Sequence, residues 1–262
     1  MRDERIDFGR AFDWGNASED YAKYRDIYPE TFYNKIVEAG LCIKGQAVLD
    51  LGTGTGVLPR NLYQYGANFI GTDPSPNQVG EAIRISRQAG MDIPYKCCSA
   101  EDADDVGGPF DVISACQCFF YFHHDIVAGK LFDLLKPGGQ LLVLYMAWLP
   151  QEDKIAGASE DLVLKFNPEW SGCGESRHTN VIPDQYLHLF DIIKEDVYDL
   201  FVPFTRETWN GRMRACRGIG ASLPQERVQE FSSEHLELLN KIAPPKFEVM
   251  HYVAMTILQV KK

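Results

Sequence analysis

The chain has 262 residues, a formal net charge of -11 at pH 7 and 45% hydrophobic residues. This length suits one α/β domain with a large core and an added lid, and two independent domains would be a tight fit. The acidic field repels phosphate backbones and anionic lipid, which argues against nucleic acid and membrane surfaces as partners. No apolar run is long enough to span a bilayer, and the charged segment 1–5 precedes no apolar stretch, which predicts a cytoplasmic protein.

The cysteines support the same compartment. Seven cysteines without a signal peptide are expected to be reduced thiols. Cys97-Cys98 and Cys116-x-Cys118 are close pairs, but neither has the spacing that lets two thiolates share one zinc ion. We therefore expect no metal site and interpret the cysteines as small buried hydrophobes.

The chain begins with an aromatic and charged segment, residues 1–29. A short helix ending at Tyr24 is expected there, capped by Asn16 or Ser18. Residues 30–42 have helical spacing and stop at Gly40.

The stretch 48–56 is the one around which the chain is organised. Apolar residues surround Asp50, and Gly52, Gly54 and Gly56 follow at alternate positions, which predicts a buried parallel strand that enters a tight turn. The glycines allow positive φ and a close approach of the backbone to a ligand, while the next helix points its free N–H groups at the same place. The pattern predicts a cofactor loop.

The glycine spacing indicates which cofactor is bound. A dinucleotide-binding turn requires a third glycine where this chain has Val57, or Pro59 if the pattern starts at Gly54. The order Gly-x-Gly-x-Gly after Asp50 resembles motif I of the class I S-adenosylmethionine-dependent methyltransferases, in the branch that acts on small molecules. The resemblance implies S-adenosylmethionine as the cofactor.

The elements after the loop agree with this resemblance. A helix is expected over 57–65 and a strand over 68–73, which puts Asp73 at the carboxyl end of the second strand, where an acid can accept both hydroxyls of an adenosine ribose. Residues 74–77 open a helix that runs through Gln88, and 94–98 is the third strand candidate.

The next turn departs from the family pattern. Relatives usually carry an Asp-Ala-Glu-like turn whose acid accepts the adenine amino group, whereas this chain reads Ser99-Ala100-Glu101-Asp102. Glu101 or Asp102 could supply the contact, or the Ala100 amide and a water molecule could.

A fourth strand is expected over 109–115, followed by a segment that is similar to the family's Gln-Ala-Phe-His-Trp-Phe. Gln117, Tyr121 and two phenylalanines fit that pattern, but Phe120 stands where the histidine is common. His123 follows, for which helix capping or surface exposure is the alternative to a catalytic role. A Lys-Pro-Gly-Gly turn and a strand over 140–147 resemble the signature before strand five.

The rest of the chain is expected to complete the sheet. The patterns predict a fold of the α/β class: a Rossmann-like, seven-stranded, mostly parallel sheet with helices on both faces and a lid. The expected parts are an N-terminal arm or lid, the S-adenosylmethionine-binding core, an insertion or lid, and the completion of the core, at residues 1–29, 30–150, 151–190 and 191–262 respectively. Within the last two parts we expect helices over 153–166 and 224–240, a helix capped by Thr205, and strands over 192–203 and 247–260.

The resemblance also assigns candidate site residues. The expected cofactor contacts are Asp50, Gly52, Thr53, Gly54, Gly56, Asp73, Pro74, Gln78, Ser99, Ala100, Glu101 and Gln117. A general base is useful if the acceptor is a hydroxyl or a protonated amine, and the candidates are Tyr21, Tyr28, His123 and His178. The candidates for contact with the small-molecule substrate are Tyr24, Arg25, Tyr121, Arg214 and Arg217, with surface ion pairs as the alternative role of the arginines.

The predicted reaction is methyl transfer to an oxygen, nitrogen or carbon nucleophile by in-line displacement. One rival hypothesis is a catalytically inactive protein that binds S-adenosylmethionine as a sensor for a partner. Another is a nicotinamide-dependent reductase, which Val57 and Pro59 disfavour.

Overall fold

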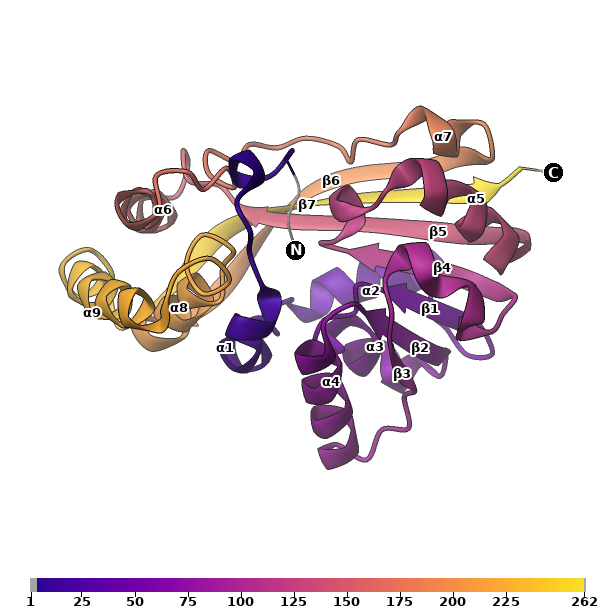
Figure 1. Ribbon diagram of the computed structural model, residues 1–262, viewed down its shortest axis with the longest axis horizontal. Coiled ribbons are helices and arrows are strands. Elements are labelled where there is room, and N and C mark those ends of the chain that lie inside the picture. The colour runs from indigo at the N-terminus through magenta and orange to yellow at the C-terminus, as the bar shows by residue number, and fades with distance from the viewer. Residues whose placement is uncertain (1–3, 262) are drawn as a thin grey trace. The chain divides into compact units, whose positions relative to one another are not determined.

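The structure of the protein is a computed structural model that describes residues 4–261 (Figure 1). Residues 1–3 of the predicted N-terminal arm, and Lys262, lie outside the described residues. None of the helices within residues 4–261 is both long and apolar enough to cross a membrane.

The chain folds into two compact units. Unit 1 comprises Met1–Ile27, Ala147–Arg177 and Asp199–Tyr252, and unit 2 comprises Tyr28–Met146, His178–Tyr198 and Val253–Lys262. Three long strands, β5, β6 and β7, carry the chain from one unit to the other. Each unit has its own hydrophobic core.

A seven-stranded sheet has the order β3-β2-β1-β4-β5-β7-β6. The pairs β1–β2, β1–β4, β2–β3 and β4–β5 are parallel. The strands are β1 (Ala47–Leu51), β2 (Asn68–Asp73), β3 (Tyr95–Cys97), β4 (Phe110–Cys116), β5 (Leu135–Trp148), β6 (Phe190–Thr205) and β7 (Lys246–Val260). The predicted fold class, a Rossmann-like, mostly parallel seven-stranded sheet, is confirmed.

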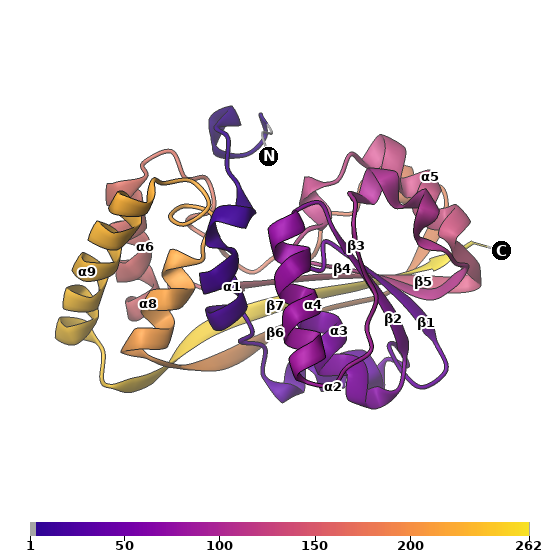
Figure 2. The same ribbon diagram turned by 60° about the horizontal axis from the view of Figure 1, so that its bottom comes forward.

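Helices cover both faces of the sheet in unit 2. Figures 1 and 2 show α2, α3 and α4 on one face, and α5 on the other. The helical elements of this unit are α2 (Glu30–Glu38), α3 (Val57–Leu62), η3 (Tyr63–Tyr65), α4 (Pro76–Gln88), η4 (Ala100–Val106), η5 (Phe119–Tyr121), α5 (His124–Leu134) and α7 (Asp184–Leu187). The core on the α5 face joins residues of β1, β4 and β5 to residues of η4, α5 and α7.

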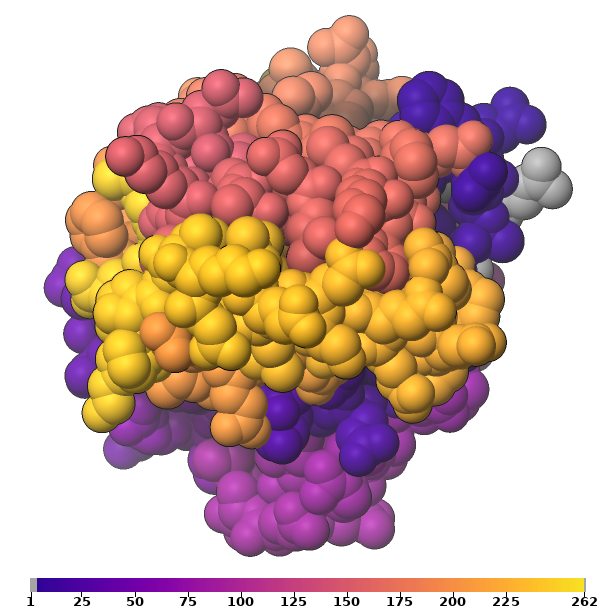
Figure 3. Space-filling view, turned by 90° about the vertical axis from the view of Figure 1, so that its left-hand side faces the viewer, coloured from indigo at the N-terminus to yellow at the C-terminus, as the bar shows by residue number. Residues whose placement is uncertain are grey.

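Unit 1 is mainly helical. Its elements are η1 (Asp7–Gly9), η2 (Trp14–Ala17), α1 (Ser18–Tyr24), α6 (Lys154–Phe166), α8 (Arg206–Arg214) and α9 (Gln225–Ile242). In the space-filling view of Figure 3, α6 and α9 lie side by side on the surface of this unit. Beneath them a core with three buried tryptophans forms around Trp148, Trp170 and Trp209.

Three of the α-helices within residues 4–261 begin at a side-chain cap. The Ser75 side chain accepts from the Gln78 amide at the start of α4, Asp153 caps α6, and Thr205 forms the predicted cap of α8. The predicted cap of the first helix is wrong, because Asp13 accepts from Gly15 and starts the 3-10 turn η2, which leads directly into α1. The short helix α7 has no counterpart among the predicted elements.

Candidate cofactor and acceptor site

The glycine loop leaves the buried strand β1 and enters α3. Gly52, Gly54 and Gly56 have φ values of +59°, +57° and +76°, a region that side chains rarely adopt. The Thr53 amide donates to the Thr72 carbonyl at 2.8 Å, which fixes the loop against the end of β2. The loop therefore has the backbone conformation that the glycine pattern predicts.

Two of these glycines also make room for neighbouring side chains. A Cβ at Gly52 would lie 2.7 Å from Cβ and Sγ of Cys118, whose thiol donates to the Leu51 carbonyl at 3.1 Å. A Cβ at Gly56 would overlap the Tyr95 hydroxyl, which bonds Ser86 at 2.9 Å. Burial raises the pKa of the Cys118 thiol and raises the pKa of Tyr95 to about 12, so both groups stay protonated at neutral pH.

Asp73 ties the glycine loop to the end of β2. Its Oδ2 accepts from the Gly54 amide and its Oδ1 from the Ser75 amide, both at 2.9 Å. The side chain is 9% exposed, and burial raises its pKa while the two amides oppose that rise. Each carboxylate oxygen keeps a second lone pair, so the group can still accept the two vicinal hydroxyls of a ribose.

Asp50 lies below the loop on β1 and is 1% exposed. The Ser114 hydroxyl of β4 donates to its Oδ1 at 2.7 Å. Burial is the largest influence on Asp50 and raises its pKa to about 6, against the Ser114 hydrogen bond. Sequence reasoning missed Ser114, although a hydroxyl in a buried apolar strand is itself a signal that a partner exists.

The strand register aligns the site across four strands. Leu51 of β1 is in register with Thr72 of β2 and Ala115 of β4, and Ala115 with Val143 of β5. One residue further, Asp73, Gly52, Cys116 and Leu144 therefore form a row at the carboxyl edge. In open parallel sheets this edge is where ligands bind.

Gln117 follows this row and has a φ of +67°, which is uncommon for a residue with a side chain. Its backbone amide donates to the Leu144 carbonyl at 2.8 Å, and its side-chain Nε2 donates to the Met146 carbonyl at 2.5 Å. These two bonds hold the end of β4 to the end of β5. Backbone conformations of this kind concentrate at functional sites.

In the turn that departs from the family pattern, the two acidic side chains each accept a hydrogen bond. The Ser99 hydroxyl donates to Asp102 Oδ2 at 2.8 Å, which brings a carboxylate beside the position where relatives carry the acid. Glu101 Oε1 accepts from the backbone amide of His123 at 2.9 Å, at the start of α5. Asp102 and Glu101 both remain candidates for the adenine contact.

Three further predicted contacts lie in the same unit. Pro74 follows Asp73 directly, Gln78 is buried in the first turn of α4, and Ala100 is buried at the start of η4. The roles of the predicted cofactor residues stay predictions. The structure brings the glycine loop, Asp73 and Gln117 to one edge of the sheet.

The four candidate bases have different surroundings. Tyr28 and His178 lie in unit 2, where the Tyr28 hydroxyl is within 3.7 Å of the Cys116 thiol that ends β4. His178 contacts the ring of Tyr145 near the end of β5, with 5.5 Å between centroids. His123 is exposed at the start of α5, and Tyr21 of unit 1 contacts Trp14 and Arg25.

The candidate substrate residues of unit 1 already have partners within that unit. The Tyr24 ring lies against Gly211 and under the Arg214 guanidinium, 5.4 Å from its centroid. Arg214 binds Asp20 through two bonds of 2.8 and 2.7 Å. The Arg25 guanidinium lies over the rings of Tyr21 and Trp14. Tyr121, the remaining substrate candidate, belongs to unit 2.

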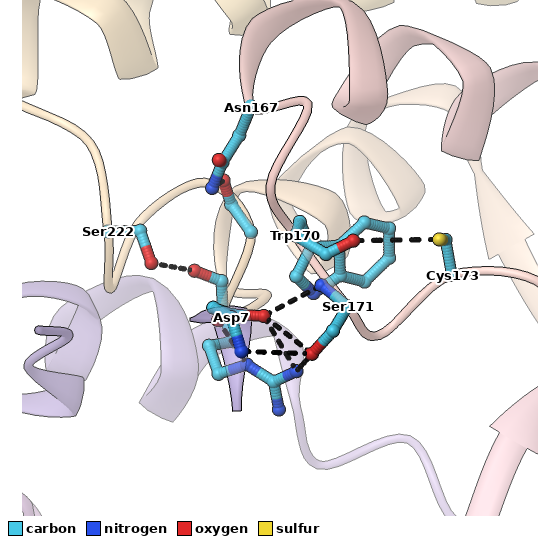
Figure 4. Close-up of polar contacts among 8 residues, drawn as sticks. Asp7, Asn167, Trp170, Ser171, Cys173 and Ser222 are labelled. Carbon is cyan, nitrogen blue, oxygen red and sulfur yellow. Dashed lines mark hydrogen bonds and ion pairs between the residues drawn. The ribbon is translucent and has the colours of Figure 1, made fainter. Parts of the chain in front are cut away.

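Arg217 makes a more deeply buried ion pair. Its Nε donates to Asp7 Oδ2 at 2.7 Å, and the two side chains are 11% and 5% exposed. Figure 4 shows Ser171 beside Asp7, with the Ser171 amide donating to Asp7 Oδ1 at 2.7 Å. Burial acts to raise the pKa of Asp7, but the bonds from Arg217 and Ser171 outweigh it and leave that pKa below its usual range. These geometries favour the ion-pair alternative for Arg214 and Arg217.

Residues 48–139 match the family model described as a methyltransferase domain. The match runs from the first residues of the glycine-loop motif to the end of the Lys-Pro-Gly-Gly turn. The chain therefore carries a methyltransferase domain over these residues. Its cofactor is S-adenosylmethionine, and the open acceptor positions of Asp73 beside the glycine loop fit that molecule's ribose.

A curated relative of the methyltransferase domain is the ubiquinone biosynthesis O-methyltransferase of Agrobacterium fabrum. It is 31% identical over 154 residues, which cover 56% of this chain and 62% of the relative. The chain thus spans less than two thirds of that relative's length.

Solved structures share the fold of the methyltransferase domain. A Haemonchus contortus phosphoethanolamine N-methyltransferase, in complex with phosphomonomethylethanolamine and S-adenosylhomocysteine, has a TM-score of 0.54 at 17% identity and covers 98% of this chain and 58% of its own. The YcgJ protein of Bacillus subtilis has a TM-score of 0.53 at 16% identity, covering 89% of this chain and 100% of its own. At these identities the likeness shows the fold alone.

Proposed function

We propose that this chain transfers the methyl group of S-adenosylmethionine to a nucleophilic atom of a small molecule, with oxygen as the first expectation. The observation that carries the proposal is the buried Asp73 carboxylate, held by Gly54 and Ser75 in one row with Gly52 and with Cys116 of β4. The name of the Agrobacterium relative, an O-methyltransferase, supports oxygen over nitrogen or carbon.

The residues of unit 2 would act mainly by binding and orienting. When bound, S-adenosylmethionine supplies a methyl group already activated by its sulfonium. Asp73 would accept the ribose hydroxyls, and the glycine loop would bring backbone N–H groups to the same ligand. Correct alignment of two reactants can lower a barrier by about 7–11 kcal/mol, so such a site requires few catalytic groups.

Calorimetry on the full chain tests the proposal. We expect S-adenosylhomocysteine to bind, and Asp73→Asn to weaken binding by about tenfold or more, since one accepting oxygen becomes an N–H₂ group. Asp92→Asn, at an exposed acid, is the matched control and should bind normally. Binding of NADH in place of S-adenosylhomocysteine would favour a nicotinamide-dependent reductase.

Turnover separates an enzyme from an inactive binding protein. We expect formation of S-adenosylhomocysteine from S-adenosylmethionine with at least one acceptor class among phenols, aliphatic alcohols, amines and carbon acids. A chain that binds the cofactor tightly and turns over with none of these would support the alternative, a catalytically inactive sensor protein.

We also propose a cytoplasmic location and a small molecule as the partner, rather than nucleic acid or a membrane. All seven cysteines are free thiols, as expected in a reducing compartment. The net charge of -11 supports the same choice, because it opposes binding to polyanions.

A further inference from the structure

Four aromatic side chains form a continuous row in unit 2, which we call the ring row: Phe120, Tyr121, Tyr145 and His178. Phe120 contacts Tyr121 with 4.2 Å between ring centroids and Tyr145 with 6.1 Å, the latter edge to face. Tyr145 contacts the His178 ring at 5.5 Å with an interplanar angle of 31°. Phe120 is 40% exposed, and His178 is also exposed, so the row is a surface and not part of the core.

The register places the ring row at the edge that carries the cofactor loop. Leu51 of β1 is in register with Ala115 of β4, and Ala115 with Val143 of β5, so Gln117 and Tyr145 each stand two residues beyond that level. Neighbouring strands are about 4.8 Å apart, so Tyr145 on β5 stands about 10 Å across the sheet from β1. That separation leaves room for a cofactor above β1 and an acceptor molecule above β5.

Asn180 fixes the segment that carries His178. Its side-chain Nδ2 lies 3.2 Å from the Val143 carbonyl of β5, 3.1 Å from the Ala254 carbonyl of β7 and 3.1 Å from the Thr256 hydroxyl. This amide fastens the chain across two strands, one row below Leu144. His178, two residues earlier, is thereby held beside Tyr145.

The hydrogen bond of His178 defines its tautomer. Nδ1 lies 2.7 Å from the Thr179 carbonyl oxygen, which can only accept, so Nδ1 carries the proton. In the neutral ring Nε2 then carries the lone pair. A histidine whose Nδ1–H is held by a carbonyl and whose Nε2 is a base is the arrangement that general-base catalysis uses.

We propose that the ring row is the acceptor subsite and takes a hydroxylated aromatic ring, with His178 as the general base that removes the hydroxyl proton. This inference rests on the proposed function. The rings of Phe120 and Tyr145 meet edge to face, and such walls favour another flat ring. A base that becomes a cation in the reaction would repel an ammonium acceptor, which disfavours amines at this site.

The proposed methyl transfer forms one bond, breaks one bond and moves one proton. The acceptor oxygen forms the new O–C bond, the C–S bond of the donor breaks, and its electron pair neutralises the sulfonium. The hydroxyl proton passes to Nε2 of His178 and from there to water. A base is needed because a phenolic hydroxyl has a pKa of about 10 and is almost fully protonated at neutral pH.

Equilibrium binding tests the subsite without catalysis. Catechol and its saturated analogue cyclohexane-1,2-diol are titrated into the full chain with S-adenosylhomocysteine present. We expect catechol to bind at least tenfold more tightly, Tyr145→Ala to remove the preference, and Tyr145→Phe to keep it, since the ring is retained. Equal binding of the two diols, or binding of neither, would overturn the subsite.

Turnover of catechol tests the base. We expect His178→Gln to lower kcat by about 10²-fold or more with KM and S-adenosylhomocysteine affinity unchanged, because glutamine cannot take up the proton. Asn180→Ala, which acts through His178, should lower kcat less and leave the diol preference in place. His188→Gln, at an exposed histidine of the same unit, is the control. An unchanged kcat in His178→Gln would overturn its assignment as base.

The subsite and the proposed function can fail separately. A chain that prefers catechol but does not bind S-adenosylhomocysteine would contradict the proposed function and support the ring subsite. A chain that binds S-adenosylhomocysteine and methylates only amines or aliphatic alcohols would support the proposed function and contradict the subsite.

Discussion

Nδ1 of His235 lies 2.9 Å from Oδ1 of Asn210, and both side chains are buried in unit 1. An amide oxygen only accepts, so Nδ1 carries a ring proton, and Nε2 lies 2.9 Å from the Ser159 hydroxyl oxygen. Trp209 Nε1 donates to the same hydroxyl oxygen at 2.9 Å. The ring is neutral, and burial together with the charge of Arg214 lowers the pKa of His235 to about 3.

This network predicts a loss of stability in acid. The unfolded chain takes up a proton on His235 near the ordinary pKa of about 6.5, whereas the folded chain does so only near 3. The free energy of unfolding should therefore fall by about 1.4 kcal/mol per pH unit as the pH drops through this window. His251, buried with a pKa of about 3, adds a loss of the same sign.

Urea unfolding at several pH values measures this loss. His235→Gln keeps an amide in place of the ring but does not titrate, so its stability should fall less steeply between about pH 6 and pH 4. His188→Gln, at an exposed histidine, should keep the slope of the native chain. Equal slopes in the native chain and His235→Gln would contradict a neutral buried ring.

Because Arg217 is paired with Asp7, we expect its substitution to lower the free energy of unfolding and not to raise KM for the acceptor. Arg217→Leu leaves the Asp7 carboxylate, 4% exposed, without its cation, and such a change costs about 3–5 kcal/mol. Arg214→Leu should cost less, because Arg214 and Asp20 are 20% and 30% exposed. Urea unfolding of both variants measures the difference.

A substrate role for Arg217 makes the opposite prediction. Arg217→Leu would then raise KM for the acceptor while the free energy of unfolding stayed within about 0.5 kcal/mol of the native value. The double variant Asp7→Leu/Arg217→Leu separates the two cases, since removing both charges should restore part of the stability lost in Arg217→Leu.

Local patterns in the sequence were sufficient to predict the elements around the cofactor loop. The strand before Gly52, the helix after Gly56 and the strand ending at Asp73 each depend on residues close in sequence, and all three form as predicted. The Lys-Pro-Gly-Gly turn is more complex, because residues 136–139 lie inside β5 as an irregularity where the register shifts from Phe110–Leu135 to Val112–Gln140. A turn signal does not distinguish a chain reversal from an outward bulge of a strand.

Contacts between residues far apart in the sequence could not be predicted. The sequence does not indicate that Cys118 packs on Gly52, that Asn180 binds β5 and β7, or that Asp7 pairs with Arg217. Spacing rules describe one helix or one strand, and these contacts depend on how several elements pack. The candidate acceptor residues lie in segments whose position depends on such long-range contacts. This explains why the cofactor could be predicted and the acceptor could not.

A methyl group added at Gly56 would meet the Tyr95 side chain, so Gly56→Ala should lower the free energy of unfolding by more than backbone strain alone. Gly56 and Gly90 both have positive φ, at +76° and +68°, so alanine should cost about 1–2 kcal/mol at each. Only Gly56→Ala also meets a side chain, the Tyr95 ring, whereas nothing lies within 4 Å of a Cβ at Gly90. We expect Gly56→Ala to lose about 1–3 kcal/mol more than Gly90→Ala in urea unfolding.

A double variant checks the cause of that excess cost. Tyr95→Ala/Gly56→Ala should show a favourable coupling between the two substitutions, because the smaller side chain leaves room for the new methyl. Strictly additive losses would mean that the strain at Gly56 arises from the backbone alone.

The titration of Asp50 should change the free energy of unfolding with pH in the opposite direction to the titration of His235. Its pKa is about 6 in the folded chain and about 3.8 in the unfolded chain, so the folded state binds the proton more tightly. The resulting stability is fully present below about pH 3.8 and is lost as the pH rises through about 6. Asp50→Asn removes this titration, while its side-chain oxygen can still accept from Ser114.

The comparison of Asp50→Asn with the native chain isolates this effect, because both carry the same histidines. Between about pH 6 and pH 4 the native chain should gain about 1.4 kcal/mol per pH unit relative to the variant, and above pH 7 the difference should be constant. Asp92→Asn, at an exposed acid, should show no such trend. A difference independent of pH would mean that Asp50 is ionised in the folded state across this range, and that burial is not the dominant influence on it.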